Sequence, residues 1–176
     1  MKLHLGCGER YIEGYKHIDI IDRDHIDHVA YVDKLPFIED NTVEVIYACH
    51  LLEHFKRRDY KRVLKEWFRV LSPDGILRIA VPDFEQAIKI YKETGDIENI
   101  MGMLYGGQNY LYNMHYNIFD YKKLSTALKD IGFKKVSRYD WRDTEHAYVD
   151  DFSQAYYPHM DKENGIQHSL NVEAIK

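Results

Sequence analysis

Two short and almost uninterrupted apolar runs most constrain the fold of this chain. Residues 43–49 (VEVIYAC) and residues 76–81 (ILRIAV) are each as long as a strand. A strand that is apolar on both faces is typical of the buried centre of a parallel sheet. Between the two runs, residues 59–71 place apolar side chains on one helical stripe and Lys and Arg on the opposite one. This strand–helix–strand order predicts an α/β fold.

The rest of the chain continues this alternation. Two further helices are predicted over residues 83–92 and 120–131, where Asp83 is a suitable N-cap and Gly132 a suitable C-terminal stop. Residues 96–116, rich in Gly, Met and Tyr, predict a helix followed by a loop. Further stretches have the composition or alternation of strands, namely residues 2–5, 17–20, 28–32, 134–139 and 168–175.

Composition narrows the class of protein. With 176 residues, 45% hydrophobic and 30% charged, the chain is expected to form a single domain over residues 1–176. The net charge of −5 argues against a general nucleic-acid coat. No apolar run approaches the roughly 20 residues that cross a bilayer, and the first residues lack the apolar stretch of a signal peptide. Cys7 and Cys49 lie inside apolar runs, as free thiols do, so we expect a cytoplasmic protein.

A glycine turn follows the first predicted strand. The turn Gly6-Cys7-Gly8 stands where glycine lets a backbone approach a ligand closely and expose its N–H groups. Tyr11 occupies the place of the third glycine of the dinucleotide fingerprint, so the turn alone suits a simple tight turn equally well. Asp19 ends the second strand, where a carboxylate can either accept hydrogen bonds from ribose hydroxyls or cap a turn.

Four motifs, in this order and spacing, resemble the class I S-adenosylmethionine-dependent methyltransferases: LHLGCG, HIDI, VDKLPFIEDNTVEVIYACHLLEHF and FRVLSPDGILRIAVPD. The resemblance covers residues 2–84 and, more weakly, residues 120–139 and 168–175. It implies a three-layer Rossmann-like methyltransferase fold with a mostly parallel seven-stranded sheet of order 3-2-1-4-5-7-6, in which strand 7 is antiparallel. It also implies methyltransferase activity with S-adenosyl-L-methionine as the cofactor, bound over the carboxyl ends of strands 1, 2 and 4.

The resemblance further implies roles for individual residues. Gly6 and Gly8 would face the methionine moiety, and Asp19 would face the ribose. The segment Asp33–Leu35 would face the adenine, and His50 would lie beside the sulfonium. The full set of cofactor-binding residues that it implies is Gly6, Cys7, Gly8, Asp19, Asp33, Lys34, Leu35 and His50.

Two departures from the family's pattern concern the cofactor site. Gly8 and Asp19 are 11 positions apart, against roughly 20 in the usual Rossmann arrangement. The first crossover is therefore predicted to shrink to about one helical turn or to a loop through residues 9–15. The acid that often precedes the first glycine is missing, because His4 and Leu5 occupy that stretch. These departures motivate the alternative of a catalytically inactive S-adenosylmethionine-binding module that acts through a protein partner.

The pentad His50-Leu51-Leu52-Glu53-His54 matches H-x-x-E-H, a zinc-peptidase pattern. That chemistry needs both histidines on one helix face and a distant third ligand. Here the pentad follows a buried strand, at a position where the methyltransferase family often carries a similar LEH. A zinc hydrolase using His50, Glu53 and His54 is therefore a remote alternative, and no metal is assigned.

Methyl transfer requires an aligned acceptor, and a base only where that acceptor has a proton to lose. His50, Glu53 and His115 are the candidate catalytic residues. His115 belongs to a Tyr-rich insertion or lid predicted over residues 95–118, where this family usually builds acceptor sites. The tyrosines could hold a ring or the sulfonium, and they would equally suit packing or an interface. An acidic, aromatic loop over residues 140–167 could also close over the site.

The expected partner is a small-molecule or sugar-like acceptor, because no recognition domain is attached. Two charged segments have opposite sign. Residues 56–69 carry seven basic and two acidic residues, a net charge of +5, and residues 140–164 carry seven acidic and two basic residues, a net charge of −5. A solvated helix face explains the basic segment. The alternatives are a phosphate-bearing partner or contact with the acidic segment of another copy, which would form a homodimer.

Overall fold

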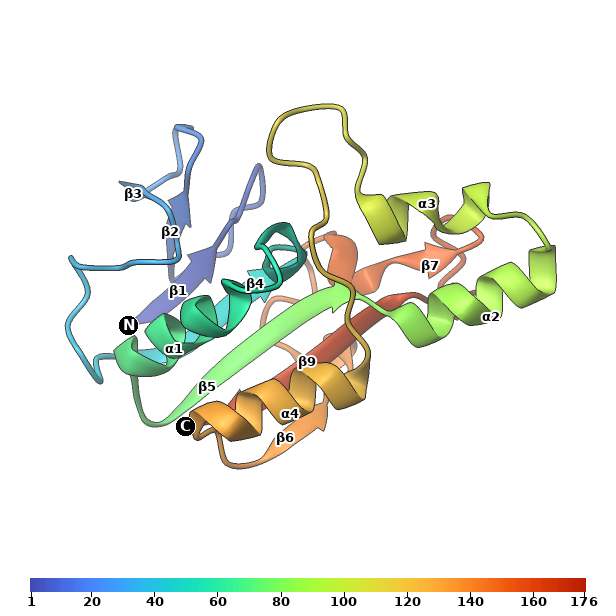
Figure 1. Cartoon of the computed structure of the whole chain (residues 1–176). Coiled ribbons are helices and arrows are strands. Elements are labelled where there is room, and N and C mark those ends of the chain that lie inside the picture. Colours follow the sequence, from blue (N-terminus) through green and yellow to red (C-terminus); the bar gives the residue numbers. More distant parts are fainter.

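Seven strands form one mixed sheet in the computed structural model, which describes residues 1–176 (Figure 1). The strands are β1 (Lys2–Leu5), β2 (Tyr15–Asp19), β3 (His28–Val29), β4 (Val43–Cys49), β5 (Leu71–Pro82), β6 (Val136–Arg138) and β9 (Ser169–Ile175). Their order is β3-β2-β1-β4-β5-β9-β6. Strands β1 to β5 run parallel, whereas β9 is antiparallel to both β5 and β6. The predicted order, with an antiparallel strand between the fifth and the edge strand, is confirmed.

Strand β5 begins earlier than the sequence predicts. Residues Ser72–Gly75 have the sequence Ser-Pro-Asp-Gly, which is typical of a turn, yet they lie within β5. Val43 is opposite Leu71 while Val45 is opposite Ile76, so the extra residues of β5 form an irregularity in the ladder. This turn-like sequence therefore lies inside a strand, after the preceding helix has ended at Val70.

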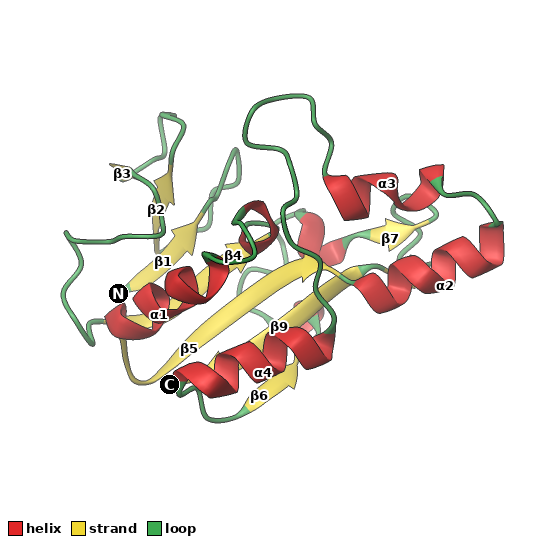
Figure 2. Ribbon diagram, viewed as in Figure 1, coloured by secondary structure: helices red, strands yellow, loops and turns green.

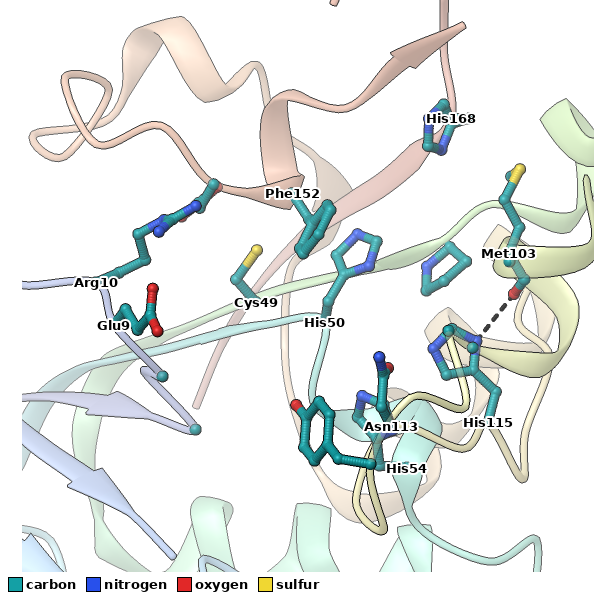
Figure 3. A pocket seen from close by; sticks show the side chains of 18 of the residues that line it. Glu9, Arg10, Cys49, His50, His54, Met103, Asn113, His115, Phe152 and His168 are labelled. Carbon is teal, nitrogen blue, oxygen red and sulfur yellow. Dashed lines mark hydrogen bonds between the residues drawn. The ribbon is translucent and has the colours of Figure 1, made fainter. Parts of the chain in front are cut away.

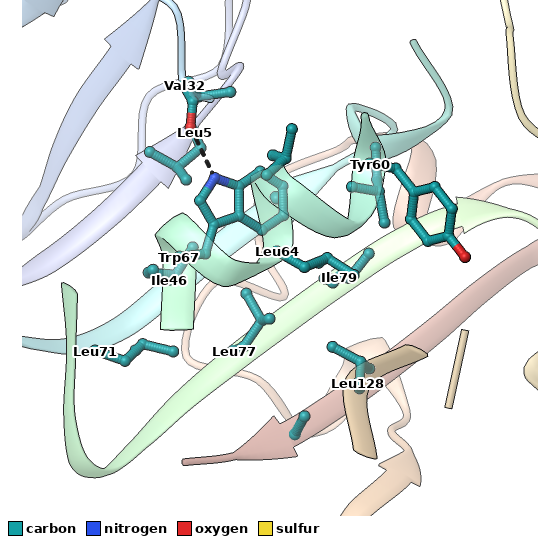
Figure 4. Close-up of a cluster of buried hydrophobic side chains, with 14 of the residues drawn as sticks. Leu5, Val32, Ile46, Tyr60, Leu64, Trp67, Leu71, Leu77, Ile79 and Leu128 are labelled. Atoms are coloured by element: carbon teal, nitrogen blue, oxygen red, sulfur yellow. Dashed lines mark hydrogen bonds between the residues drawn. The ribbon is translucent and has the colours of Figure 1, made fainter. Parts of the chain in front are cut away.

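Two helices, α1 (Tyr60–Val70) and α4 (Tyr121–Ile131), cover one face of the sheet (Figure 2). Trp67 of α1 is fully buried, and its indole N–H donates to the Val32 carbonyl at 2.9 Å (Figure 4). Each such large apolar side chain stabilises the fold by about 1.5–3 kcal/mol through burial. The sequence predicts an apolar stripe of Tyr60, Val63, Leu64, Trp67, Phe68 and Leu71. All of these are buried except Phe68, which is partly exposed, and Val70 is buried with them.

Capping residues fix where the helices start and stop. The Asp83 carboxylate accepts a hydrogen bond from the Glu85 N–H at the start of α2 (Phe84–Thr94). Asp120 caps α4 in the same way through the Lys123 N–H, and Gly132 follows the last residue of α4. Each side chain satisfies an N–H that has no partner within its helix, which is worth about 1 kcal/mol. The predicted caps are confirmed.

Loops cover the opposite face of the sheet, where the structure has no α-helix. The connection between β1 and β2 contains no helix, which confirms the shortened first crossover. The buried side chains of this face include the polar His4 and His17 beside a small apolar cluster that contains Tyr47. His146, from the segment between β6 and β9, lies with its ring 4.0 Å from that of Tyr47, measured between centroids. The third layer implied by the family resemblance is thus built from loops.

A small extension lies beyond the carboxyl end of β5 (Figure 1). It consists of α2, α3 (Glu98–Tyr105) and a hairpin of β7 (Tyr156–Tyr157) and β8 (Ile166–Gln167). Its own apolar cluster contains Ala87, Ile90 and Ile100. After α3 the chain forms a loop, so the predicted helix followed by a loop is confirmed. No helix of the structure combines the length and apolar content that a membrane span requires.

Candidate functional site

A cleft of about 800 Å³ lies at the carboxyl ends of β1, β4 and β5 (Figure 3). The turn after β1 forms one side, and α3 with its following loop forms the other. Asp151 and Phe152, from the segment between β6 and β9, also line it. In parallel α/β sheets, ligands bind outside the carboxyl ends of the strands, so this is the expected place for a ligand site.

Five of the predicted site residues line this cleft: Gly6, Cys7, Gly8, His50 and His115. The backbone at Gly6 and Gly8 has φ of +60° and +57°, the left-handed region that glycine adopts without strain. A Cβ added to Gly8 would meet nothing within 4 Å, so the space beside the Cα of Gly8 is open. His50 also has a positive φ, of 47°, which is unusual for a side chain of this size and is typical of functional positions.

Asp19 lies beside the glycine turn but does not line the cleft. Its side chain is buried, and one carboxylate oxygen accepts from the Gly8 N–H at 2.9 Å. The other oxygen accepts from the Ile21 N–H at 2.8 Å. The structure therefore gives Asp19 a bracing role at the turn, and its contact with a ribose stays a prediction.

Asp33, Lys34 and Leu35 lie outside the lining of the cleft. Leu35 is fully buried, and its N–H donates to the Glu66 carboxylate at 2.6 Å. Asp33 pairs with Arg62 at 2.9 Å, and Lys34 is exposed. The segment is anchored to α1 through these contacts. Its predicted contact with adenine is not tested by this arrangement and stays a prediction.

The three candidate catalytic residues lie close together. Glu53 belongs to a 3₁₀ turn, η1 (Leu52–His54), that follows β4. Its carboxylate is fully buried, and Oε1 lies 3.4 Å from His50 Nδ1 and 3.9 Å from His115 Nε2. Burial raises the pKa of Glu53 to about 8, so this carboxyl is largely protonated at neutral pH.

Burial has the opposite effect on the histidines of the cleft. It lowers the pKa of His115 to about 4 and that of His50 well below its ordinary value. Both imidazoles are therefore neutral at pH 7. His50 Nε2 lies 3.1 Å from the Ser169 hydroxyl, which positions the ring against β9. A neutral imidazole offers one lone pair, which can accept a proton or bind a metal ion.

Several residues that line the cleft were not predicted from the sequence. Glu9, Arg10 and Arg23 line the cleft near the glycine turn. Phe152 lies beside His50, with its ring 5.2 Å from the imidazole, while remaining 64% exposed. These residues come from loops without regular periodicity. Only their position in the sequence, next to a predicted strand end or inside the acidic aromatic segment, could have indicated that they line the cleft.

A family model described as a methyltransferase domain matches residues 18–79. A search of curated proteins finds no significant match. Solved structures with the same fold include a chain from a complex between the Haloferax volcanii Trm112 methyltransferase activator and a candidate methyltransferase. It has 15% identity and a TM-score of 0.57, and the match covers 99% of this chain and 81% of that chain.

Two further solved structures have the same fold. One is 1,6-didemethyltoxoflavin-N1-methyltransferase of Burkholderia thailandensis with bound 1,6-didemethyltoxoflavin and S-adenosylhomocysteine, at 15% identity and a TM-score of 0.60, covering 99% of this chain and 70% of that chain. The other is an S-adenosylmethionine-dependent methyltransferase of Thermotoga maritima, at 14% identity and a TM-score of 0.59, covering 99% of this chain and 81% of that chain. At these identities the likeness shows the fold alone. The fold that the resemblance implies is therefore confirmed, and residues 18–79 match a methyltransferase-domain model.

Proposed function

We propose that the protein is a cytoplasmic S-adenosylmethionine-dependent methyltransferase that acts on a small-molecule acceptor. The observation that carries this proposal is the shared cleft. The Gly6–Gly8 turn, where the family resemblance puts the methionine moiety, lines the same cavity as His50 and His115. A volume of about 800 Å³ lies within the range of small-molecule and cofactor sites.

The residues around the glycine turn fit the amino-acid end of the cofactor. That end carries a carboxylate and an ammonium group, so it needs partners of both charges. Glu9 and Arg23 line this part of the cleft and supply them, which offsets the missing acid before Gly6. Gly8 adds an open backbone position. The Burkholderia structure of the same fold contains S-adenosylhomocysteine, which supports the same cofactor here.

The acceptor would lie between His50 and the loop after α3. His115 lies on that loop, and its Nδ1 donates to the Met103 carbonyl at 3.0 Å, which leaves Nε2 as the proton acceptor. For an acceptor that must lose a proton, neutral His115 is better suited as the base than Glu53, whose raised pKa keeps it protonated. For an acceptor that has no proton to lose, alignment suffices.

Two measurements test the proposal. Calorimetry should show binding of S-adenosylmethionine and S-adenosylhomocysteine to one site per chain. A screen of metabolites with labelled S-adenosylmethionine should then yield a methylated acceptor. His115→Asn should reduce turnover while leaving affinity for S-adenosylhomocysteine within about twofold, and the exposed His159→Asn should change neither. The absence of binding for both ligands at millimolar concentration would refute the proposal.

A second candidate is a cofactor-binding module that acts through a protein partner. Exposed apolar residues near the mouth of the cleft favour it, among them Leu111 at 72% exposure and Phe152 at 64%. The Haloferax complex contains a methyltransferase activator, so an activating partner has a precedent on this fold. Binding of the cofactor does not separate the two candidates. Turnover by the isolated chain does, and its absence across the screen favours the module.

A further inference from the structure

Glu53, His54 and His115 gather at one end of the cleft, with one ligand atom of each within 4.8 Å of the others. Glu53 and His54 belong to η1, and His115 belongs to the loop after α3 (Figure 3). Backbone hydrogen bonds hold the two segments together. The N–H groups of Tyr116 and Asn117 donate to the Glu53 carbonyl at 2.8 Å and 3.1 Å. The proximity of the three side chains is therefore built into the backbone.

Backbone carbonyls orient both imidazoles. His54 Nδ1 lies 3.0 Å from the Met114 carbonyl oxygen, and His115 Nδ1 lies 3.0 Å from that of Met103. A carbonyl can only accept, so each Nδ1 carries the proton and each Nε2 keeps its lone pair. Metal-binding histidines are usually held in this way, with the second ring nitrogen bonded to a carbonyl or carboxylate.

The Glu53 carboxylate lacks any compensating partner. It is fully buried, and neither of its oxygens has a hydrogen bond. A buried carboxylate without a partner costs several kcal/mol. A proton or a cation would offset the cost of burying this carboxylate, and the two oriented imidazoles favour a cation.

We propose that Glu53, His54 and His115 bind one divalent transition-metal ion, of which Zn²⁺ is the reference case. Two imidazoles and one carboxylate suit such ions, and sites with three protein ligands leave a coordination position open. Ligand atoms about 2.1 Å from one ion lie roughly 3.4 Å apart in a tetrahedron, so the set closes slightly when the ion binds. His54 and His115 line the cleft, so the open position faces it.

This site differs from the zinc-peptidase pattern in the pentad. His50 is not a ligand, because its Nε2 is next to the Ser169 hydroxyl and its Nδ1 faces Glu53. Glu53 is a ligand and not a general base. Cys49, the thiol at the end of β4, does not belong to this group of ligand atoms.

An ion in this position would select the acceptor. Its open position would take a hydroxyl, carboxylate or other oxygen donor of the acceptor. Because the ion would occupy the lone pair of His115 Nε2, His115 would then be a ligand and not the base, and the ion would assist loss of the proton by lowering the pKa of a bound hydroxyl. This consequence for the acceptor rests on the proposed function. Binding of the ion does not, because it needs only the three side chains.

Metal binding by the chelator-treated full chain tests the proposal. Calorimetry with zinc chloride should show one ion per chain, and Co²⁺ should give visible absorption of a nitrogen–oxygen site without thiolate charge-transfer bands. Glu53→Gln and His115→Asn should each weaken binding at least about tenfold. His28→Asn is the matched control and should bind normally, because His28 stacks on Phe37 away from the cleft.

The variants keep the test interpretable. Glu53→Gln preserves volume, and His115→Asn retains an N–H donor toward the Met103 carbonyl, with folding of each checked by thermal unfolding. No binding of Zn²⁺ or Co²⁺ at millimolar concentration, unchanged affinity in both variants, or thiolate bands in the Co²⁺ spectrum would overturn the site. Calorimetry of S-adenosylhomocysteine with metal-free protein tells a failure of the metal site from a failure of the proposed function. Cofactor binding without metal binding would overturn the metal site alone. Metal binding without cofactor binding would overturn the proposed function alone.

Discussion

The backbone N–H of Gly8 donates to the Asp19 carboxylate at 2.9 Å, which couples the turn after β1 to the end of β2. The second oxygen of Asp19 is bonded to the Ile21 N–H. One carboxylate therefore holds both loops together at the edge of the cleft. This bracing is compatible with a ribose contact, since each carboxylate oxygen has a further lone pair.

Asp19→Asn should weaken both the fold and the cofactor site. An amide has only one acceptor oxygen, so one of the two backbone N–H groups would lose its partner in a buried position. We expect the free energy of unfolding to fall by about 1–3 kcal/mol and the affinity for S-adenosylhomocysteine to decrease. Urea unfolding and calorimetry measure the two effects. Asp22→Asn, at an exposed position, should alter neither, and wild-type stability of Asp19→Asn would contradict the bracing role.

Gly6→Ala should destabilise the protein more than Gly14→Ala. Both positions have positive φ, of +60° and +81°, so alanine is strained by about 1–2 kcal/mol at each. A Cβ on Gly6 would also lie 2.5 Å from the Leu51 Cδ1, whereas one on Gly14 meets nothing within 4 Å. The additional clash should cost about 1–3 kcal/mol. Urea unfolding of the two variants checks this difference, and equal losses of stability would argue against close packing at Gly6.

The central fold could be predicted because its signals are local. Periodicity identified β4, α1 and β5, and single residues such as Asp83 and Gly132 fixed helix ends through contacts within a few positions. The family resemblance then supplied the strand order. Local rules of this kind need no knowledge of which distant segments meet.

The site could be predicted only in part, because long-range contacts decide it. Leu35 is turned toward α1 by a hydrogen bond to Glu66, 31 positions away, which no local pattern shows. His115 meets Glu53 through backbone bonds formed by a loop without periodicity. The loops over the second sheet face were likewise unpredictable, because the polar side chain of His4 is not the apolar signal that marks a buried strand face.

Removing the Glu66 carboxylate should release the segment around Leu35. Glu66 accepts from the Leu35 N–H at 2.6 Å, and it also pairs with Arg69, which lowers the pKa of Glu66. Glu66→Ala leaves the Leu35 N–H without a partner, so we expect a loss of about 1–3 kcal/mol in unfolding free energy. Lys65→Ala, at an exposed position on the same helix, is the control. Denaturant unfolding measures the loss of unfolding free energy in both variants. Equally small losses would show that other contacts hold the segment around Leu35.

Buried histidines on the loop-covered face should make the fold sensitive to acid. Burial lowers the pKa of His4 to about 3 and that of His146 to about 4, whereas both titrate near 6.5 in the unfolded chain. Between the folded and the unfolded pKa values, the unfolded chain binds more protons than the folded chain. The contribution of these histidines to folding stability is therefore fully present above pH 6.5 and is lost as the pH falls. Each histidine adds a slope of about 1.4 kcal/mol per pH unit within its window. Glu53 opposes this trend, since its raised pKa of about 8 makes stability decline as the pH rises from about 4.3 to 8.

Stability should therefore be greatest near pH 6.5, where the histidine contribution is complete and the Glu53 contribution is only partly lost. Thermal unfolding of the metal-free protein across this range measures the curve. His4→Phe, which fills a similar volume without a titrating group, should flatten the acid limb by about 1.4 kcal/mol per pH unit. The exposed His159→Asn should leave the slope unchanged. Parallel acid limbs for wild type and His4→Phe would mean that His4 is protonated in the folded state, and the acid sensitivity would then have to arise elsewhere.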